Sequence, residues 1–397
     1  MGSKKCATVC FLGGGRIVGD WEYVVKKDIF VGMSKCDMNI YKVCCWGQRV
    51  LGAMLALVLI CGDVCGQEGL TDDIRSEDLQ LIGEAVNDLE MGEIRAAYEI
   101  LEGMAVRYSE NYLVGYELGV AELGLGMTDR AAKRFGDLTR HGLANDQTWQ
   151  MMGNALDAGG RSGEAAGAYR EGLRKFPRSG RLMNEMGTLR LRSGDYAGAI
   201  GWFEQGMEAE PEYAGNFYRA GWMELNSSEP RDGIRYGEAL MLMEMKGERV
   251  GEMSELLYRA WSEVMRGALR HEREPRDTVD VIVARECRRW GYAGLGDEVV
   301  SFRLIGRIKW ELMDVECYDP RSEEEMGDFG LGERCSVAWE KVREMEEAIE
   351  RHGHWEAYCV WLLREGDRDQ ANEWMQMNED KMERFAKWLG KFKGMDM

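Results

Sequence analysis

Residues 146–179 read DQTWQMMGNALDAGGRSGEAAGAYREGLRKFPRS, and this stretch decides the fold. Ala165 and Tyr169 lie four residues apart, so they share one face of a helix. Gly160 stands between two apolar segments, where a glycine allows the chain to turn sharply. Pro177 follows the second segment, and the residue before a proline disfavours helical geometry. The stretch therefore predicts two helices joined by a tight turn.

The same residue types recur along the chain at a step of 34. A fixed period of this length indicates stacked helical hairpins, because one hairpin cannot bury its apolar face without neighbours. We expect the glycines inside helices to admit a second helix closely, and those between helices to adopt turn conformations. The positions that keep the step are Gly119, Gly153, Gly187 and Gly221; Gly92, Gly126, Gly160 and Gly194; Ala131, Ala165 and Ala199; Phe135, Tyr169 and Phe203; and Pro177 and Pro211.

These residues resemble the tetratricopeptide repeat family, whose first helix carries Trp and Gly and whose second carries Ala and an aromatic residue before a Pro. Trp149 and Gly153 match the first helix, and Ala165, Tyr169 and Pro177 match the second. The resemblance implies an all-α fold, namely a right-handed α-α solenoid of helical hairpins. The expected repeats are 78–111, 112–145, 146–179, 180–213 and 214–247, of which the first and last are degenerate.

Residues 248–397 are expected to form a helical C-terminal extension in which the 34-residue register is lost. Their apolar spacing follows a helical period, and clusters of Gly, Pro and acidic residues mark the loops. The expected helices are Met253–Met265, Thr278–Trp290, Glu298–Val315 and Arg334–Glu350, and the expected loops are Arg266–Thr278 and Tyr318–Gly332.

The end of the chain is expected to form one more hairpin of the repeat type. Six positions match the relative positions of Trp149, Met152, Leu156, Gly160-Arg161, Ala165 and Tyr169; they are Trp355, Tyr358, Leu362, Gly366-Asp367, Ala371 and Met375. The nearby Trp374, Phe385 and Trp388 either pack the final helix or form a site for a partner.

The chain carries a formal net charge of −19. Nucleic-acid binding calls for clustered basic charge, so the balance predicts no nucleic-acid partner. It also disfavours binding to anionic lipid. An acidic surface either attracts a basic partner or simply keeps the chain soluble.

Residues 1–66 have the features of an N-terminal leader with a signal peptide. Lys42 and Arg49 precede an apolar core at 50–60, and Gly66 offers a small residue before the expected cleavage. The apolar core is short for a membrane span. We therefore expect an exported, extracytoplasmic protein, either periplasmic or secreted.

Two alternatives for the leader stay open. Residues 50–65 could remain uncleaved as a membrane anchor, or Cys61 or Cys65 could belong to a lipoprotein signal. The encoded start could also lie too early, since Met33 and Met38 are closer to the apolar core. Association with a membrane is expected only if the segment is uncleaved.

Residues that could carry chemistry are few, and we predict no catalytic, cofactor or metal site. The His352-Gly353-His354 stretch lacks a second pair of ligands at metal-binding spacing. The glycine-rich residues 13–19 lack the Lys-Ser/Thr ending of a phosphate loop. Four cysteines outside the leader form disulfides if the chain is exported, or stay as buried thiols; they are Cys287, Cys317, Cys335 and Cys359.

The family resemblance implies a binding face on the concave side, lined by the first helix of each repeat. Asn154 occupies a position that often bonds a peptide backbone, but Gln150 stands where peptide-clamping members carry lysine. Tyr218 and Trp222 would supply an aromatic anchor, unless Trp222 packs against the C-terminal helices. The exposed positions implied are Tyr116, Val120 and Leu123; Gln150, Asn154 and Asp157; Asn184, Thr188 and Leu191; and Tyr218, Trp222 and Leu225.

The leading hypothesis is a non-catalytic scaffold or adaptor that binds a protein or peptide. One alternative is a structural component that forms homo-oligomers through its C-terminal helices. Another is an enzyme with an unrecognised site in the C-terminal third, although no converging set of ionisable residues indicates one. A fold alone does not decide among these functions.

Overall fold

The computed structural model describes residues 71, 73–271, 273, 275–293, 300–313 and 336–393, all of which belong to one unit, Cys65–Met397. The predicted leader and its apolar core at 50–60 lie outside these residues, as does the loop predicted at Tyr318–Gly332. The described residues contain helices and no strand. None of these helices is both long and apolar enough to span a membrane.

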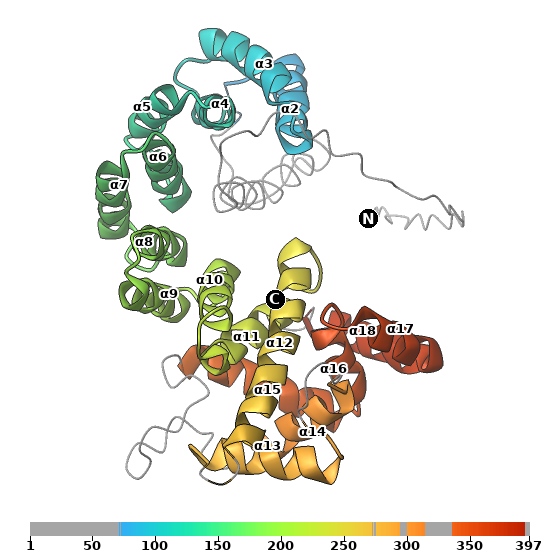
Figure 1. Cartoon of the computed structure of the whole chain (residues 1–397). Coiled ribbons are helices and arrows are strands. Elements are labelled where there is room, and N and C mark those ends of the chain that lie inside the picture. Colours follow the sequence, from blue (N-terminus) through green and yellow to red (C-terminus); the bar gives the residue numbers. More distant parts are fainter. Residues whose placement is uncertain are drawn as a thin grey trace, which may run out of the picture. The chain divides into compact units, whose positions relative to one another are not determined.

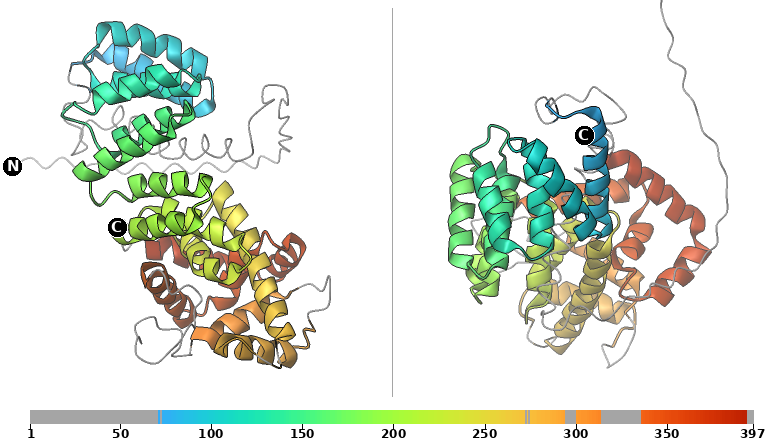
Figure 2. Two further views of the ribbon diagram at one scale, coloured as in Figure 1. Left: turned by 60° about the vertical axis from the view of Figure 1, so that its left-hand side comes forward. Right: turned by 90° about the horizontal axis from the view of Figure 1, so that it is seen from above.

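Helices come in pairs along the repeat region, and Figures 1 and 2 show the pairs following one another in chain order. The two helices of a pair pack together, and the second helix of each pair contacts the first helix of the next. The bounds are α2 Ser76–Met91 and α3 Ile94–Arg107; α4 Tyr112–Gly124 and α5 Thr128–Leu138; α6 Asp146–Ala158 and α7 Ser162–Lys175; α8 Gly180–Arg192 and α9 Tyr196–Ala209; and α10 Ala214–Leu225 with the short η1 Pro230–Gly233 and α11 Ile234–Met243.

The turn glycines behave as the sequence predicts. Gly92, Gly126, Gly160 and Gly194 have φ angles of 84°, 74°, 77° and 79°, which is the left-handed region that glycine tolerates best. Each of them lies between the two helices of a pair. The chain can therefore reverse direction at the same place in four successive repeats.

The helix glycines create space for the aromatic ring of the partner helix. A Cβ atom added to Gly153 would lie 2.0 Å from a ring carbon of Tyr169, and one added to Gly187 would lie 2.4 Å from Phe203. In the fifth repeat the ring is missing, and a Cβ atom added to Gly221 would instead lie 3.0 Å from the backbone nitrogen of Gly237. Helices α10 and α11 thus approach each other backbone to backbone.

The C-terminal extension begins with a helix that keeps the repeat step, which corrects the expectation that the register is lost. Helix α12, Glu248–Arg270, begins 34 residues after Ala214, where α10 begins. It also continues through Arg266–Arg270, which we expected to be part of a loop. The remaining helices are α13 Thr278–Arg289, α14 Phe302–Met313, α15 Ser336–Arg351, α16 Trp355–Leu363, α17 Arg368–Met377 and α18 Glu379–Lys393.

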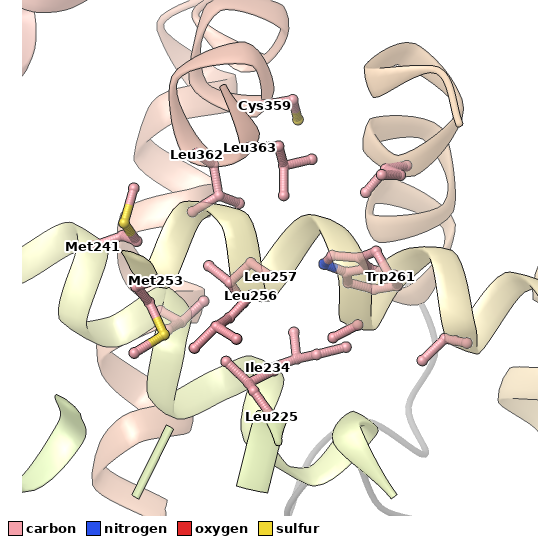
Figure 3. Packing of buried hydrophobic residues seen from close by; sticks show 14 of the residues in the cluster. Leu225, Ile234, Met241, Met253, Leu256, Leu257, Trp261, Cys359, Leu362 and Leu363 are labelled. Carbon is pink, nitrogen blue, oxygen red and sulfur yellow. The ribbon is translucent and has the colours of Figure 1, made fainter. Parts of the chain in front are cut away.

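One apolar core joins the last repeat to the extension. Figure 3 shows Leu225 and Ile234 facing Met253, Leu257 and Trp261 of α12. The same cluster continues into α16 and α18. Because Leu257 and Trp261 are fully buried, α12 covers the apolar side of the fifth repeat, as the cap of a solenoid must.

The predicted terminal hairpin exists as the contacting helices α16 and α17, but its glycine has a different role from the one expected. Gly366 does not adopt the left-handed φ of the other turn glycines. A Cβ atom at Gly366 would lie 2.2 Å from the Cβ of Tyr258 on α12. Glycine is needed here so that the hairpin can press against α12.

A buried cluster of charges also ties the extension to the fifth repeat. Arg235 of α11 bonds Glu238 at 2.9 Å and Glu346 of α15 at 3.3 Å. Lys309 of α14 pairs with Glu238 and, at 2.7 Å, with Glu346, which also accepts the Tyr358 hydroxyl at 3.2 Å. Two positive and two negative side chains therefore balance one another inside the protein, as buried charges require.

Candidate functional site on the first helices of the repeats

The nine residues predicted to bind a partner lie on the first helices α4, α6, α8 and α10, and we call this set the helix-A face. Three of them, Val120, Asp157 and Trp222, are partly buried. The expectation of exposure is wrong for the other six, whose exposed fractions are Tyr116 4%, Gln150 6%, Asn154 8%, Asn184 2%, Thr188 6% and Tyr218 4%. Leu123 and Leu225 are buried as well.

Contacts between successive repeats explain part of this burial. The Gln150 amide donates a hydrogen bond to Glu185 at 2.7 Å, from α6 to α8. The Asn184 amide donates to the Asn216 amide oxygen at 3.1 Å, from α8 to α10. Buried polar groups are stable only when hydrogen-bonded. These side chains therefore hold neighbouring repeats together.

Three other members of the helix-A face also form hydrogen bonds or ion pairs with neighbouring protein groups. The Tyr169 hydroxyl donates to the Asn154 amide oxygen at 2.6 Å, so the group expected to bond a peptide already holds a helix partner. Asp157 forms an ion pair with Arg192 of α8 and accepts the Ser162 hydroxyl at 2.7 Å. The Thr188 hydroxyl donates to the backbone of its own helix.

Tyr218 and Trp222 lie together, as expected, and both reach α12. The Tyr218 hydroxyl donates to one carboxylate oxygen of Glu252 at 2.7 Å, and the Trp222 indole N–H donates to the other at 3.0 Å. Burial and the bond to Glu252 raise the pKa of Tyr218. Trp222 packs against the apolar core that the last repeat shares with the extension, which agrees with the alternative expectation for this residue. Its side chain nevertheless remains partly accessible.

Sequence reasoning missed two arginines that stand over aromatic rings, Arg219 over Tyr218 and Arg181 over Tyr213. Arg219 is partly buried and stands over the Tyr218 ring at 5.8 Å, and among the described residues it makes no hydrogen bond or ion pair. Arg181 of α8 stands over the Tyr213 ring at 5.2 Å. Sequence reasoning looked for a cation only at the position of Gln150, whereas these arginines lie at other positions. The signal that could have found Arg219 is the repeat step, because Arg219 lies 34 residues after Glu185 and occupies the same repeat position.

Two carboxyl groups in the same repeat position have raised pKa values; Glu117 is buried and Glu185 is partly buried. Burial raises the pKa of Glu185, while Gln150 and nearby arginines, among them Arg219, act against the rise. Glu117, at twice the repeat step before Glu185, has no such cation, and burial raises its pKa to about 7 with a smaller contribution from Glu90. The arginines thus oppose the effect of burial on the Glu185 carboxyl group.

The structure shows the surroundings of the histidines and cysteines that were considered for metal binding or disulfides. His352 and His354 each pack their rings 5.3 Å from the Trp388 ring. Within the described residues no group of three His, Cys, Asp or Glu side chains could hold a metal ion. Cys287 and Cys359 are both buried, and burial raises the pKa of the Cys359 thiol. Cys317 and Cys335 lie outside the described residues.

Comparisons with known proteins place the repeat pattern in a family. The model of the tetratricopeptide repeat family matches residues 151–214. No curated protein matches the sequence.

Among solved structures, a double mutant of MamA from RS-1 is 15% identical, with a TM-score of 0.34 over 43% of this chain and 96% of its own. YrrB, described as a repeat protein with an unusual peptide-binding site, is 17% identical, with a TM-score of 0.30 over 44% and 91%. A tetratricopeptide repeat protein from Parabacteroides merdae is 16% identical, with a TM-score of 0.35 over 61% and 95%.

The matched family model covers the repeats in which the glycine, alanine and aromatic positions recur most regularly. The helix pairs of the structure have the same step as the sequence pattern. Residues 151–214 therefore match the tetratricopeptide repeat family.

Proposed function

We propose that the chain is a non-catalytic scaffold that binds a protein or peptide segment on its helix-A face, in an extracytoplasmic compartment. The observation that carries this proposal is the pair Arg219 and Trp222 on α10. Both are partly buried, and Arg219 has no ion pair among the described residues. Tetratricopeptide repeats are expected to bind proteins.

The pair has the chemistry of an interface anchor. Arg219 and Trp222 are three residues apart, so they lie on the same side of α10. Tryptophan and arginine are the residue types most enriched among those that dominate binding energy. A guanidinium that makes no ion pair can bind a carboxylate of a partner in a two-bond geometry. A segment with a carboxylate next to an apolar side chain fits both groups.

The binding test should spare the residues that hold the repeats together. Tyr218 is buried and bonded to Glu252, so its substitution would disturb the contact between α10 and α12. Arg219→Glu changes a partly accessible group that makes no such bond in the described part of the chain. Trp222→Ala also removes a hydrogen bond to Glu252, so its result counts only beside that of Arg219→Glu. Arg174→Glu on α7 is the matched control, because Arg174 is exposed and lies on a second helix.

The measurement is capture of partners from extracts of the native cell by the Gln67–Met397 chain. Proteins retained by the parent and by Arg174→Glu, but lost with Arg219→Glu and Trp222→Ala, would support the helix-A face. Equal capture by all four chains, each folded by circular dichroism, would place binding elsewhere.

The extracytoplasmic part of the proposal rests on the leader in the sequence and needs its own test. Fractionation of cells that express the full chain should recover it outside the cytoplasm, shortened near Gly66. Recovery of the uncut chain in the cytoplasm would contradict export, and recovery of the uncut chain in membranes would favour the anchor.

A further inference from the structure

The extension contains a pocket of about 660 Å³ that lies between α14, α16 and α17. Its volume falls within the range of small-molecule sites. Four of the thirteen tryptophans of the chain line it, namely Trp290, Trp310, Trp355 and Trp374. The helix-A face contributes no residue to this pocket.

The tryptophans form walls held in fixed orientations. The rings of Trp310 and Trp355 lie 5.9 Å apart at an angle of 78°, so they meet as a corner. The Trp355 indole N–H donates to the Gly306 carbonyl at 3.0 Å, which fixes the Trp355 ring. Trp290 is 52% exposed, which is unusual for a tryptophan and leaves one wall open to a ligand.

The charged groups of the lining leave an excess of negative charge. Arg307 pairs with Glu311 of its own helix and, at 3.9 Å, with Glu286. Arg303 lies 4.0 Å from Glu356, which is also bonded by Lys381 at 2.6 Å.

Glu373 also lines the pocket and is exposed, and it forms no ion pair in the described part of the chain. Glu350 contributes one more carboxyl group to the lining. Both guanidinium groups therefore have carboxylate partners, whereas Glu373 has no cation.

We propose that this pocket binds an organic cation, an alkylated ammonium group carried either by a small molecule or by a side chain of another protein. The faces of indole rings are negative and attract cations, most strongly where water is excluded. The same faces repel anions. Glu373 adds a full negative charge at the opening, and the acidic chain as a whole attracts cations.

The decisive measurement compares a cation with its uncharged copy by calorimetry on the Gln67–Met397 chain. Choline and 3,3-dimethylbutanol have the same shape and differ in the charge of one atom. Choline should bind roughly 5-fold or more tightly than 3,3-dimethylbutanol. The anion 3,3-dimethylbutyrate is titrated as a third probe. The proposal would be overturned if choline and 3,3-dimethylbutanol bound equally, if the anion bound more tightly than choline, or if no probe bound.

Two sets of variants test the proposal. The first locates the site, and the second changes the charge of its lining. Trp310→Leu keeps an apolar side chain and should weaken choline binding about 5-fold. Trp202→Leu on α9 should leave it unchanged, because Trp202 packs in the repeat core.

Glu373→Gln should weaken binding and Arg303→Gln should strengthen it, each about 2-fold. Both residues are exposed, so these two changes decide the matter if Trp310→Leu fails to fold. The opposite pair of signs would indicate an anion site and overturn the proposal.

The source of the cation needs one further comparison. A short peptide with trimethyl-lysine is titrated beside the same peptide with norleucine. Binding of the first alone, more tightly than choline, would identify a protein side chain as the source. Tighter binding of choline than of either peptide would identify a small molecule.

Discussion

Single glycines determine how closely the helices of a pair approach. We expect Gly153→Ala to destabilise the protein by about 2–3 kcal/mol, because the new methyl group would collide with the Tyr169 ring, which is itself 1% exposed. The measurement is urea unfolding followed by circular dichroism.

Gly167 provides the matched control for this prediction. It lies on α7 with no atom within 4 Å of an added Cβ. Gly167→Ala should therefore stabilise the helix by about 0.5–1 kcal/mol, through the higher helix propensity of alanine. If the two substitutions shift stability in the same direction, the ring contact does not explain Gly153.

Glu117 should make stability depend on pH near neutrality. Burial raises the pKa of Glu117 to about 7 in the folded chain, against an ordinary value of 4.5. The folded state therefore keeps this proton while the unfolded state loses it. The stability from Glu117 is fully present below pH 4.5 and is lost as the pH rises to about 7, by roughly 2–4 kcal/mol.

Glu117→Gln removes the titrating group and tests this sign. The variant should match the parent at pH 4.5 and exceed it in unfolding free energy at pH 8. Glu99→Gln, at an exposed position of α3, is the control and should follow the parent at both values. A parent that gains stability between pH 5 and 7 relative to Glu117→Gln would show that the direction is wrong.

At the scale of helices, the buried charges join α14 and α15 of the extension to α11. Burial alone would lower the pKa of Lys309, but Glu238 and Glu346 outweigh it and raise the pKa. Burial acts to raise the pKa of Glu346, but Lys309 and Arg235 hold it below its usual range. Both residues therefore stay charged at neutral pH, and each depends on the other.

Lys309→Met should destabilise the chain by about 3–5 kcal/mol, because Glu238 and Glu346 would keep one uncompensated negative charge inside the core. Adding Glu238→Gln restores the balance of charge. The double variant should thus be more stable than Lys309→Met alone. Urea unfolding of both single variants and the double variant gives the coupling energy. Additive losses would mean that the three groups act independently.

The helices of the repeats could be predicted from sequence, whereas the first helix of the extension could not be assigned to the same period. In α12 the position of the helix glycine is occupied by Glu255, which is exposed. Among the described residues, no second helix packs an aromatic ring against this position. A glycine is therefore not required here, unlike in the other repeats. Glu252, 34 residues after Tyr218, continues the helix-A position and bonds that residue.

The helix-A residues were located through the family resemblance, but their burial could not be foreseen. Whether Gln150 faces a ligand or Glu185 depends on where the next repeat lies, and a single repeat does not contain that information. The same holds for the tryptophan pocket. Trp290 and Trp374 are 84 residues apart, and no spacing rule brings them together.

For the whole chain, the structure predicts that the repeats and the extension fold as one cooperative unit at the C-terminal side. The core that includes Phe203 and Phe217 continues without interruption to Leu389. At the other end, α2 and α3 pack mainly on α4 among the described elements. The two ends of the repeat region should therefore respond differently to truncation.

A chain that ends at Gly247 should lose its folded monomeric state, and a chain that begins at Asn111 should keep it. The first cut removes Met253, Leu257 and Trp261, which are fully buried against α10 and α11. Each such side chain contributes about 2 kcal/mol through burial, and the exposed faces of α10 and α11 lose a similar amount. Together these losses are comparable to the whole stability of a domain, about 5–15 kcal/mol.

Size-exclusion chromatography and thermal unfolding, with the 71–397 chain as parent, test this asymmetry. The chain that ends at Gly247 should aggregate or unfold without a sharp transition. The chain that begins at Asn111 loses the side chains of α2 and α3 that form a small cluster with Leu118 and Ala121, and it should melt cooperatively a few degrees below the parent. If the repeats without the extension melt as sharply as the parent, α12 is not their cap. The shared core would then be an interface between two independent domains.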